Sequence, residues 1–278
     1  MSLATAARAA SPVGSSSAMA VIASLLEKRT GQQLDPGRAW RIEANLKPIL
    51  HGLGMTTLDE LVTGLVASRD GKLSDQVVDA LLNQETSFFR DAQVYDLIAE
   101  ALAALRAQSA GRRLRLWSAG CSNGQEPLSL AMLLDERGLT GDAVEIVATD
   151  VSTGAITRAR QGRYSQFEIQ RGLSIHRMMK WFEGEGAEWT ARRDLVQRIQ
   201  FRENNLASDM PPAGSFDLAL CRNVLLYFSP PQRTEAFERI ARALRPGGLL
   251  VLGASETVIG QTDRFRPSSR WRGLYERV

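Results

Sequence analysis

Three short stretches of the 278-residue sequence combine glycine, acidic and amide residues in patterns that suit the binding of a nucleoside. The first, SAGCSNGQEP, places Gly120 and Gly124 between an apolar run and a segment of helical character. Glycine lets the main chain approach a ligand closely, and the helix that follows offers unpaired N–H groups. The spacing is not G-x-G-x-x-G and no P-loop lysine follows, so the turn does not favour a pyrophosphate. A glycine pair alone is better explained as a tight turn between a strand and a helix.

The second stretch, VATD, ends in Asp150, about 20 to 30 residues beyond the glycine turn. A carboxylate in this position can accept hydrogen bonds from the hydroxyl groups of a ribose. The alternative is that Asp150 caps the helix predicted over STGAITRAR, a task that Ser152 could equally perform. Because the glycine turn lies upstream, we favour the ribose interpretation.

The third stretch, LCRNVLLYF, brings polar side chains to the end of an apolar run. Arg222 and Asn223 follow the run directly, and Tyr227 comes shortly after them. The alternative is that Asn223 caps a turn and Tyr227 is an amphipathic core residue. Together, the three stretches predict a site that binds a ribose and an adenine but lacks the residues that bind a pyrophosphate. S-adenosylmethionine (SAM) fits this description better than NAD or ATP.

The elements that must position these residues alternate between strand and helix. Apolar runs of strand length stand at 114–119, 144–150, 216–223 and 249–255, with segments of helical character between them. Strands that alternate with helices form right-handed βαβ units, and such strands are apolar throughout because both faces of a parallel sheet are covered. The predicted fold class is therefore α/β, with a doubly wound, mostly parallel, Rossmann-like sheet. Ligands bind these sheets at the carboxyl ends of the strands, where we expect the three stretches to meet.

The pattern of helix and strand signals divides the chain into three predicted parts. Residues 1–17 are expected to form a disordered tail rich in Ala and Ser, and residues 18–90 a helical N-terminal domain. Residues 91–278 are expected to form the SAM-binding domain, in which Asp91 caps the first helix and a small antiparallel β insertion occupies 165–204. The closing segment SSRWRGLYERV alternates in polarity and predicts a last antiparallel strand.

Composition and charge argue against several classes of protein. No apolar run approaches the roughly 20 residues that a membrane-spanning helix needs, and the N-terminus lacks the apolar centre of a secretory signal. The net charge is +3 without a long run of Lys or Arg, so we expect no nucleic-acid partner. Cys121 and Cys221 lie outside any metal-ligand spacing and are too few for a disulfide framework. We therefore expect a cytoplasmic protein with reduced thiols, without membrane insertion and without a metal.

Four blocks, in order along most of the chain, resemble the motifs of the bacterial chemotaxis-receptor glutamate methyltransferases. They are NQETSFFRD, WSAGCSNGQEPLSLAMLL, ATDVSTGAITRARQGRY and FDLALCRNVLLYF…ARALRPGGLLVLGASE. The resemblance implies a class I methyltransferase domain, preceded by a helical domain and interrupted by an antiparallel β-subdomain. It also implies that a methyl group passes from SAM, leaving S-adenosylhomocysteine, to glutamate side chains on the cytoplasmic methylation helices of chemoreceptors.

The resemblance further implies roles for individual residues. Arg90 and Tyr227 are the catalytic positions, nearest to the transferred methyl group, and Glu126 is placed to bind the ammonium group of the cofactor. The cofactor-binding positions that the resemblance and the three stretches indicate are Gln84, Thr86, Arg90, Gly120, Glu126, Asp150, Asn205, Leu206, Cys221, Arg222 and Asn223.

One departure from the family pattern bears on function. The family usually carries Asn two residues before Thr86, where this chain has Gln84, with Asn83 just before it. The amide contact can persist through Gln84, pass to Asn83 or be lost. Its loss would favour an alternative function, that of a catalytically weak SAM-binding sensor or adaptor in a chemosensory pathway. A third possibility is a methyltransferase of the same fold that acts on a small molecule or on another protein.

The expected chemistry needs no general base, because a glutamate side chain with a pKa of about 4.3 is already ionised at pH 7. Arg90 could hold a carboxylate in a bidentate fork, and Tyr227 could orient the attacking oxygen. The alternative for Arg90 is an ion pair with Asp91 or Glu85.

Two features concern the receptor. The segment FEGEGAEWTARRD is shorter than the insertion of family members that dock on a C-terminal peptide tether of the receptor, so we expect substrate binding without such a tether. Arg38, Arg41 and Lys47, along one predicted helix, could meet the acidic receptor helices, although charges on a helix are usually just a solvated face.

Overall fold

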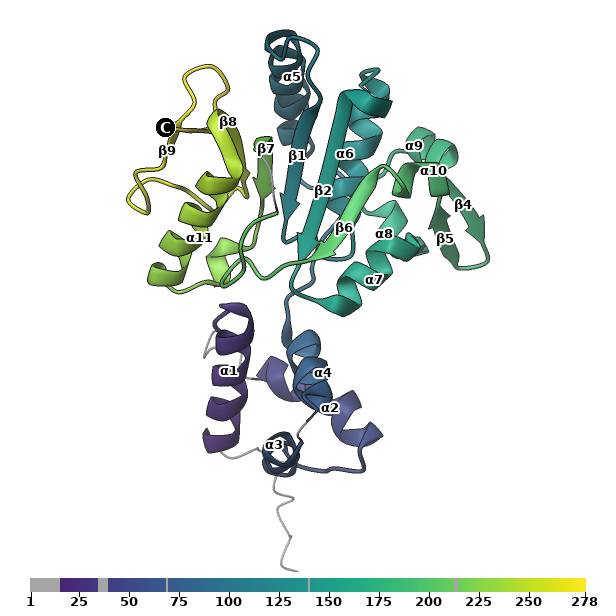
Figure 1. Cartoon of the computed structure of the whole chain (residues 1–278). Coiled ribbons are helices and arrows are strands. Elements are labelled where there is room, and N and C mark those ends of the chain that lie inside the picture. Colours follow the sequence, from purple (N-terminus) through teal and green to yellow (C-terminus); the bar gives the residue numbers. More distant parts are fainter. Residues whose placement is uncertain (1–15, 35–39, 69, 140, 213–214) are drawn as a thin grey trace, which may run out of the picture. The chain divides into compact units, whose positions relative to one another are not determined.

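The computed structural model describes residues 16–34, 40–68, 70–139, 141–212 and 215–278 (Figure 1). These residues fall into two compact units that divide between Leu82 and Asn83. The tail predicted over residues 1–17 lies outside the described residues as far as residue 15, and Ser16 begins the first helix. Within the described part of the chain, no helix is both long and apolar enough to cross a membrane.

The first unit is built from amphipathic helices. Its helices are α1 (Ser16–Thr30), α2 (Trp40–Gly52), α3 (Leu58–Ala67) and α4 (Lys72–Leu81). Each helix buries a stripe of apolar residues at helical spacing, such as Ile22 and Leu26 on α1 and Val77, Val78 and Leu81 on α4. These stripes pack against one another and form the core of the unit.

The second unit contains a mostly parallel sheet with the strand order β6-β2-β1-β7-β8-β10-β9. The parallel strands are β1 (Leu114–Ala119), β2 (Val144–Asp150), β6 (Ile199–Glu203), β7 (Phe216–Cys221) and β8 (Leu244–Leu252). The antiparallel strands are β9 (Phe265–Pro267) and β10 (Tyr275–Arg277). The predicted α/β fold, with its last strand antiparallel, is therefore confirmed. The strand order reverses between β1 and β7, which is the point where such sheets bind ligands.

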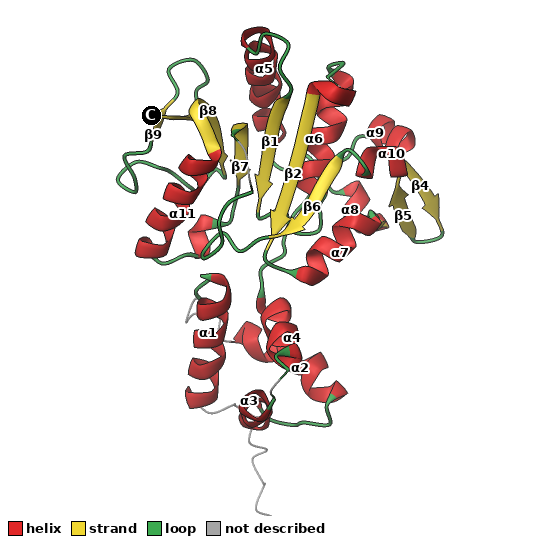
Figure 2. Cartoon of the chain, viewed as in Figure 1, coloured by secondary structure: helices red, strands yellow, loops and turns green. Residues whose placement is uncertain are grey.

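Helices cover both faces of this sheet (Figure 2). They are α5 (Ala92–Gln108), α6 (Gln125–Glu136), α7 (Thr153–Gln161) and α11 (Pro230–Ala243). Side chains alternate along a strand, so β1 contributes to both layers. Leu114 and Leu116 pack in a core with buried residues of α5 and α6, whereas Trp117 and Ala119 pack in a second core with α11.

A small antiparallel sheet with the order β3-β5-β4 interrupts the α/β alternation. Its segment comprises β3 (Arg163–Ser165), α8 (Gln166–Gln170), α9 (Ile175–Trp181), β4 (Phe182–Glu185), β5 (Glu188–Ala191) and α10 (Arg193–Val196). The sequence places the end of this insertion at residue 204, but β6 is a parallel strand of the main sheet. The alternating burial of β6, with Ile199 and Phe201 inside, resembles an antiparallel strand because β6 lies at the sheet edge and has one covered face.

The stretch 83–91 belongs to the second unit, although the sequence assigns most of it to the first. The ring of Phe88 is fully buried and packs edge-on against Tyr164 and Phe182, with ring centroids 5.0 and 5.4 Å apart. The main-chain N–H of Phe89 donates a hydrogen bond of 2.9 Å to the hydroxyl of Ser129 on α6. These anchors position the polar residues on either side of the two phenylalanines.

Candidate functional site

The predicted site residues of the α/β domain meet at one edge of the sheet. In Figure 1 the arrows of β1, β2 and β6 point toward the same edge. β1, β2, β6 and β7 each end in or lead into residues that the sequence singles out, and these are Gly120, Asp150, Asn205, Leu206, Cys221, Arg222 and Asn223. The stretch 83–91 adds Gln84, Thr86 and Arg90 to the same unit, and Thr86 is half-buried there.

The glycine turn after β1 has no room for a side chain at Gly120. Gly120 has φ +75°, and a Cβ atom at this position would lie 2.4 Å from Cγ2 of Val224. The N–H groups of Gly120 and Cys121 both donate to the carbonyl oxygen of Thr149 at the end of β2, at 2.8 and 2.9 Å. The turn is thus held by hydrogen bonds to the end of β2 and packs against Val224 in the loop after β7.

Asp150 braces the glycine turn and does not cap a helix. Its Oδ2 accepts the N–H of Ser122 at 2.8 Å, and its Oδ1 accepts the N–H of Ser152 at 3.0 Å. The cap of α7 is Ser152, whose hydroxyl accepts the N–H of Ala155 at 3.0 Å. Asp150 thereby joins the turn after β1 to the start of α7.

Glu126, at the start of α6, is a carboxyl group in a largely buried setting, with 12% of its side chain exposed. Burial raises its pKa above the ordinary value, and the charge of Arg222 and the hydroxyl of Ser118 only partly oppose that shift. Ser118 donates to Oε1 at 2.7 Å, and Arg222 donates to Oε2 at 3.4 Å. A ligand cation beside this carboxyl would therefore favour its charged form and lower its pKa.

Arg222 is almost completely buried, with 2% of its side chain exposed. Its Nη2 donates to a carboxylate oxygen of Asp91 at 2.6 Å and to the carbonyl oxygen of Arg90 at 2.8 Å. Arg222 thus ties the turn at 90–91 to the end of β7, while its buried Nε finds no hydrogen-bond partner in the described part of the chain. Asp91 stands at the N-cap position of α5, as predicted, but it has φ +59° and its side chain makes no capping hydrogen bond, because its carboxylate binds Arg222.

The ion pairs that the sequence leaves open for Arg90 are not formed in the described part of the chain. Asp91 pairs with Arg222, and Glu85 pairs with Arg171 at 2.7 Å. The guanidinium of Arg90 donates to the carbonyl oxygen of Glu85 at 3.3 Å. A neutral main-chain partner leaves the charge of Arg90 without a carboxylate among these neighbours.

The two adjacent amides have separate partners. The side-chain N–H of Asn83 donates to the hydroxyl oxygen of Tyr227, and Oδ1 of Asn83 accepts the N–H of Glu85 at 3.4 Å. Gln84 donates to the hydroxyl of Ser152 at 3.2 Å. The contact with Tyr227 is therefore made by Asn83, and Gln84 reaches the loop that follows β2.

Asn223 carries a buried side-chain oxygen to which no described residue donates a hydrogen bond. Its main chain has φ +59°, and its Oδ1 finds no hydrogen-bond partner in the part of the chain that the structure describes. Because a buried polar atom without a partner is costly, this oxygen suits a ligand with N–H or O–H groups. Cys221 beside it is buried, and burial raises the pKa of its thiol, so we assign it to packing and not to chemistry.

After β6, Asn205 and Leu206 shape the next loop of this edge. The Oδ1 of Asn205 accepts the N–H of Ala207 at 3.0 Å, and its own N–H donates to Asp209 at 2.7 Å. Leu206 is buried and packs in the core that also holds Ala119 of β1 and Cys221 of β7. The loop thereby keeps an apolar wall close to the carboxyl ends of these strands.

Sequence reasoning missed Glu256, which follows β8. Its carboxylate accepts main-chain N–H groups from Asn223, Val224 and Leu226 in the loop after β7. The signal was present, since an acid stands after the carboxyl end of a parallel strand in GASE, as Asp150 does in VATD. Its partners were not readable, because they come from another loop.

The donor and acceptor set at this edge fits a cationic nucleoside. Asp150 can accept from hydroxyl groups, Glu126 suits an ammonium group, and the orphaned oxygen of Asn223 suits a ligand donor. Across the described residues, no cluster of three or more His, Cys, Asp or Glu side chains could hold a metal ion.

The sequence is similar to those of known methyltransferases. The sequence model of the family described as CheR methyltransferase, SAM-binding domain, matches residues 84–273. The chain is 37% identical over 248 residues to the chemotaxis protein methyltransferase Cher2 of Pseudomonas putida, across 87% of this chain and 90% of the relative. It is 36% identical over 247 residues to a chemotaxis protein methyltransferase of Vibrio parahaemolyticus, across 86% and 89% of the two chains. A solved TehB-like SAM-dependent methyltransferase from Corynebacterium glutamicum is 16% identical with a TM-score of 0.38, across 64% of this chain and 84% of that chain.

Proposed function

Because the chain belongs to the CheR methyltransferase family, we propose a specific acceptor for the methyl group that it takes from SAM, namely glutamate side chains on the cytoplasmic helices of chemoreceptors. Methyl transfer from SAM in chemotaxis, and SAM as the cofactor, come with the family. The product of each turnover would be a glutamate methyl ester, formed in the cytoplasm.

The observation that carries this proposal is a pair of hydrogen-bond donors, the guanidinium of Arg90 and the hydroxyl of Tyr227. Arg90 has no carboxylate partner among its described neighbours, and the hydroxyl of Tyr227 is oriented by Asn83. An acceptor that is already an anion needs donors to hold it, whereas an alcohol or amine acceptor would need a base. This arrangement favours a carboxylate acceptor.

The hydroxyl of Tyr227 is available to donate a hydrogen bond to the substrate. Oδ1 of Asn83 accepts the N–H of Glu85, which turns the amide nitrogen toward Tyr227. The phenol oxygen therefore accepts from Asn83, and its own O–H is left to donate to a carboxylate oxygen of the acceptor. Tyr227 would thereby orient the attacking oxygen.

Arg90 would make the second contact with the acceptor carboxylate, since a guanidinium can bind a carboxylate through two parallel N–H···O hydrogen bonds. SAM supplies the methyl group as an electrophilic carbon on a sulfonium. The acceptor glutamate is ionised at neutral pH and needs no general base. Arg90 and Tyr227 would therefore increase the rate by aligning the acceptor oxygen with the methyl group. Glu126 and Asp150 would hold the ammonium and ribose ends of the cofactor.

The alternative function, a catalytically weak sensor or adaptor, rests on Gln84 at the usual Asn position. Asn83 supplies an amide to Tyr227 from the neighbouring position, and Gln84 keeps a contact with Ser152. Both amides therefore make hydrogen bonds to residues of the site, which supports the function of an enzyme over that of a sensor.

Incubation of the full-length protein with radiolabelled SAM and a chemoreceptor cytoplasmic fragment tests the proposal. We expect a base-labile methyl ester on receptor glutamates. Tyr227→Phe should lower the rate by about 10- to 100-fold, the value of one charge-assisted hydrogen bond, with unchanged affinity for S-adenosylhomocysteine. Tyr275→Phe, whose hydroxyl contacts Thr257 near the C-terminus, is the control and should keep full activity. Tight cofactor binding without any ester would support the sensor instead.

Independence from a receptor tether is part of the same proposal, and the charge of the small sheet supports it. β4 is an edge strand, and it carries Glu183 and Glu185, with Glu188 beside them on β5. All three side chains are exposed. A receptor tail that ends in a carboxylate would add a like charge to this edge, which is unfavourable.

The test compares two receptor fragments, one with and one without its C-terminal peptide. We expect equal kcat/KM for the two substrates, and no inhibition by the free peptide. A substantially higher kcat/KM for the fragment that carries the peptide would contradict tether independence.

A further inference from the structure

The loop that carries Tyr227, defined as residues 222–228, is held along its N–H groups by one carboxylate. Oε2 of Glu256 accepts the N–H of Asn223 at 2.7 Å, and Oε1 accepts those of Val224 and Leu226, both at 3.1 Å. Oε2 also accepts the N–H of Gly253 at 2.8 Å. Four main-chain donors therefore converge on Glu256, which fills the acceptor capacity of a carboxylate.

The carbonyl groups of the same loop are held by one guanidinium. Arg233, on α11, donates from Nε to the carbonyl oxygen of Leu225 at 3.1 Å and from Nη2 to that of Phe228 at 3.1 Å. Its Nη1 donates to Oε1 of Gln261 at 3.4 Å. Leu225 and Phe228 bracket the short 3-10 helix η3 (Leu225–Tyr227), so Arg233 acts at the turn that presents the tyrosine ring.

The loop has little space in which to shift. A Cβ at Gly253 would lie 2.8 Å from Nδ2 of Asn223 and 2.9 Å from a carboxylate oxygen of Glu256. At the other side, Cγ2 of Val224 fills the space above Gly120. Sterics limit movement of the first half of the loop, and hydrogen bonds to Glu256 and Arg233 set its register.

We propose that Glu256 and Arg233 are positioning residues for the methyl transfer. Glu256 holds the donor side of the 222–228 loop and Arg233 holds its acceptor side, so that the hydroxyl of Tyr227 stays where Asn83 reaches it. Neither residue needs to touch the cofactor or the acceptor glutamate. This inference rests on the proposed function, in which Tyr227 orients the attacking oxygen.

A double-mutant cycle between Arg233→Gln and Tyr227→Phe tests the proposal with the full-length protein. If Arg233 acts through Tyr227, Arg233→Gln alone should lower kcat by about 10- to 100-fold, the penalty of a misplaced catalytic group. In the Tyr227→Phe background the same change should have less than about a twofold effect, because the two losses share one cause. Affinity for S-adenosylhomocysteine and KM for the receptor fragment should stay within about twofold.

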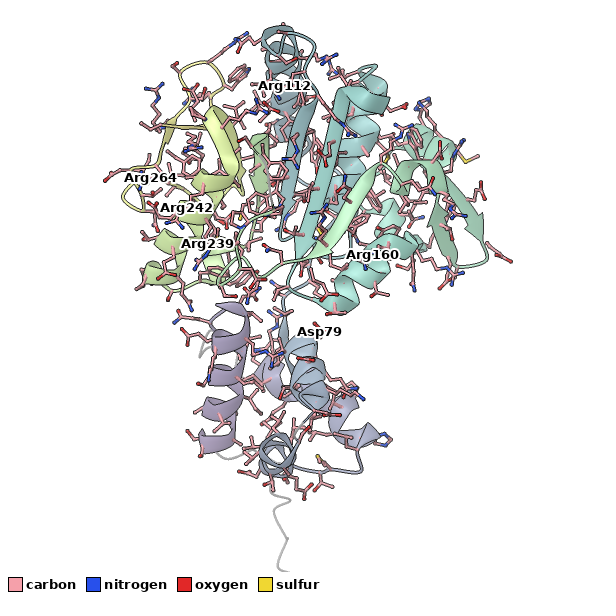
Figure 3. All side chains as sticks on the ribbon, viewed as in Figure 1. Asp79, Arg112, Arg160, Arg239, Arg242 and Arg264 are labelled. Atoms are coloured by element: carbon pink, nitrogen blue, oxygen red, sulfur yellow. The ribbon has the colours of Figure 1, made fainter. Side chains whose placement is uncertain are left out.

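Two further variants keep the result interpretable. Arg242→Gln changes an exposed arginine on the same helix and is the matched control, expected to leave kcat unchanged (Figure 3). Arg233→Lys retains the charge but not the fork geometry, so we expect a kcat between those of the wild type and Arg233→Gln. The urea midpoint of each variant shows whether it is folded.

Glu256→Gln tests the other side of the loop. It removes the charge that four N–H groups share, so kcat should fall. Affinity for S-adenosylhomocysteine should fall too, because Glu256 holds Asn223, a predicted cofactor-binding residue.

Each outcome has a distinct meaning. Additive losses in the cycle, or an unchanged kcat for folded Arg233→Gln, would overturn the positioning role while leaving the proposed function intact. A Tyr227→Phe enzyme with full activity would instead overturn the proposed role of Tyr227.

Discussion

The amides at positions 83 and 84 divide two contacts between them, one with Tyr227 and one with Ser152. A side chain one methylene longer than Asn stands at the usual position, and it reaches the hydroxyl of Ser152, the cap of α7. The neighbouring Asn83 orients the phenol. Gln84, where the family usually carries Asn, therefore keeps a hydrogen-bond partner inside the second unit, and the preceding residue supplies a second amide.

Glu126 leads to a prediction about pH. Burial raises its pKa in the free protein, so between the ordinary pKa of a glutamic acid and the raised value the carboxyl is protonated. A bound ammonium group favours the ionised form, so binding in this window releases a proton, and affinity for S-adenosylhomocysteine should rise with pH until it levels off above the window. Calorimetric titrations at several pH values measure this rise.

Glu126→Gln is the variant for that measurement. It should remove the pH dependence and weaken binding on the plateau by about 1.5 to 3 kcal/mol, the value of a hydrogen bond to a charged group. The same shift has a consequence for folding, since Glu126 favours the folded state most below the ordinary pKa and loses that contribution as pH rises through the raised value. Affinity that is independent of pH in the wild type would remove Glu126 from the ammonium site.

Among the structural elements, the turn after β1 is the most constrained part of the site. Gly120→Ala adds a methyl group 2.4 Å from Val224 at a residue with φ +75°, so it combines a steric clash with backbone strain. We expect it to lower the free energy of unfolding by about 2 to 4 kcal/mol, from strain and overpacking together, and to weaken cofactor binding. Urea denaturation and calorimetry provide the two measurements.

Gly138→Ala is the matched control for that change, because Gly138 has φ +67° with nothing within 4 Å of the added Cβ. It should cost about 1 to 2 kcal/mol from backbone strain alone. Gly120→Ala combined with Val224→Ala should recover the part due to the clash. Equal costs for the two alanine variants would show that the close packing on Val224 does not matter.

At the scale of the whole molecule, the hypothesis that the first unit meets the acidic receptor helices depends on α2. On α2, Trp40 is 68% exposed and Lys47 is exposed, with Arg41 half-buried on the same helix, whereas Arg38 lies outside the described residues. Complementary charge speeds association and is screened by salt. Basic residues here would favour encounter with acidic receptor helices.

The double reversal Arg41→Glu and Lys47→Glu should therefore lower kcat/KM for the receptor fragment by about 3- to 10-fold at low salt, with a smaller effect at high salt. Cofactor affinity should not change. Lys28→Glu, an exposed lysine on α1, serves as the control. If the reversal and the control behave alike, α2 has no special part in receptor binding.

The sequence by itself determined the alternation of strands and helices and the polar residues at the strand ends. Both follow from local pattern, because apolar runs, glycine turns and caps are read from neighbouring residues. It also led to Asp150, since a carboxylate at the end of a parallel strand must lie at the ligand edge of the sheet.

Only the tertiary structure decided how those residues pair. Asn83 and Tyr227 are 144 positions apart, and Arg222 and Asp91 are 131 positions apart. Such pairings depend on which loops the strand order of the sheet brings together. The periodicity of hydrophobic residues within a segment does not predict that strand order. Sequence reasoning missed Glu256 for the same reason, because its four donors come from the loops after β7 and β8. The position of β6 in the main sheet was also not predicted, because the alternating pattern of its residues resembles that of an antiparallel edge strand.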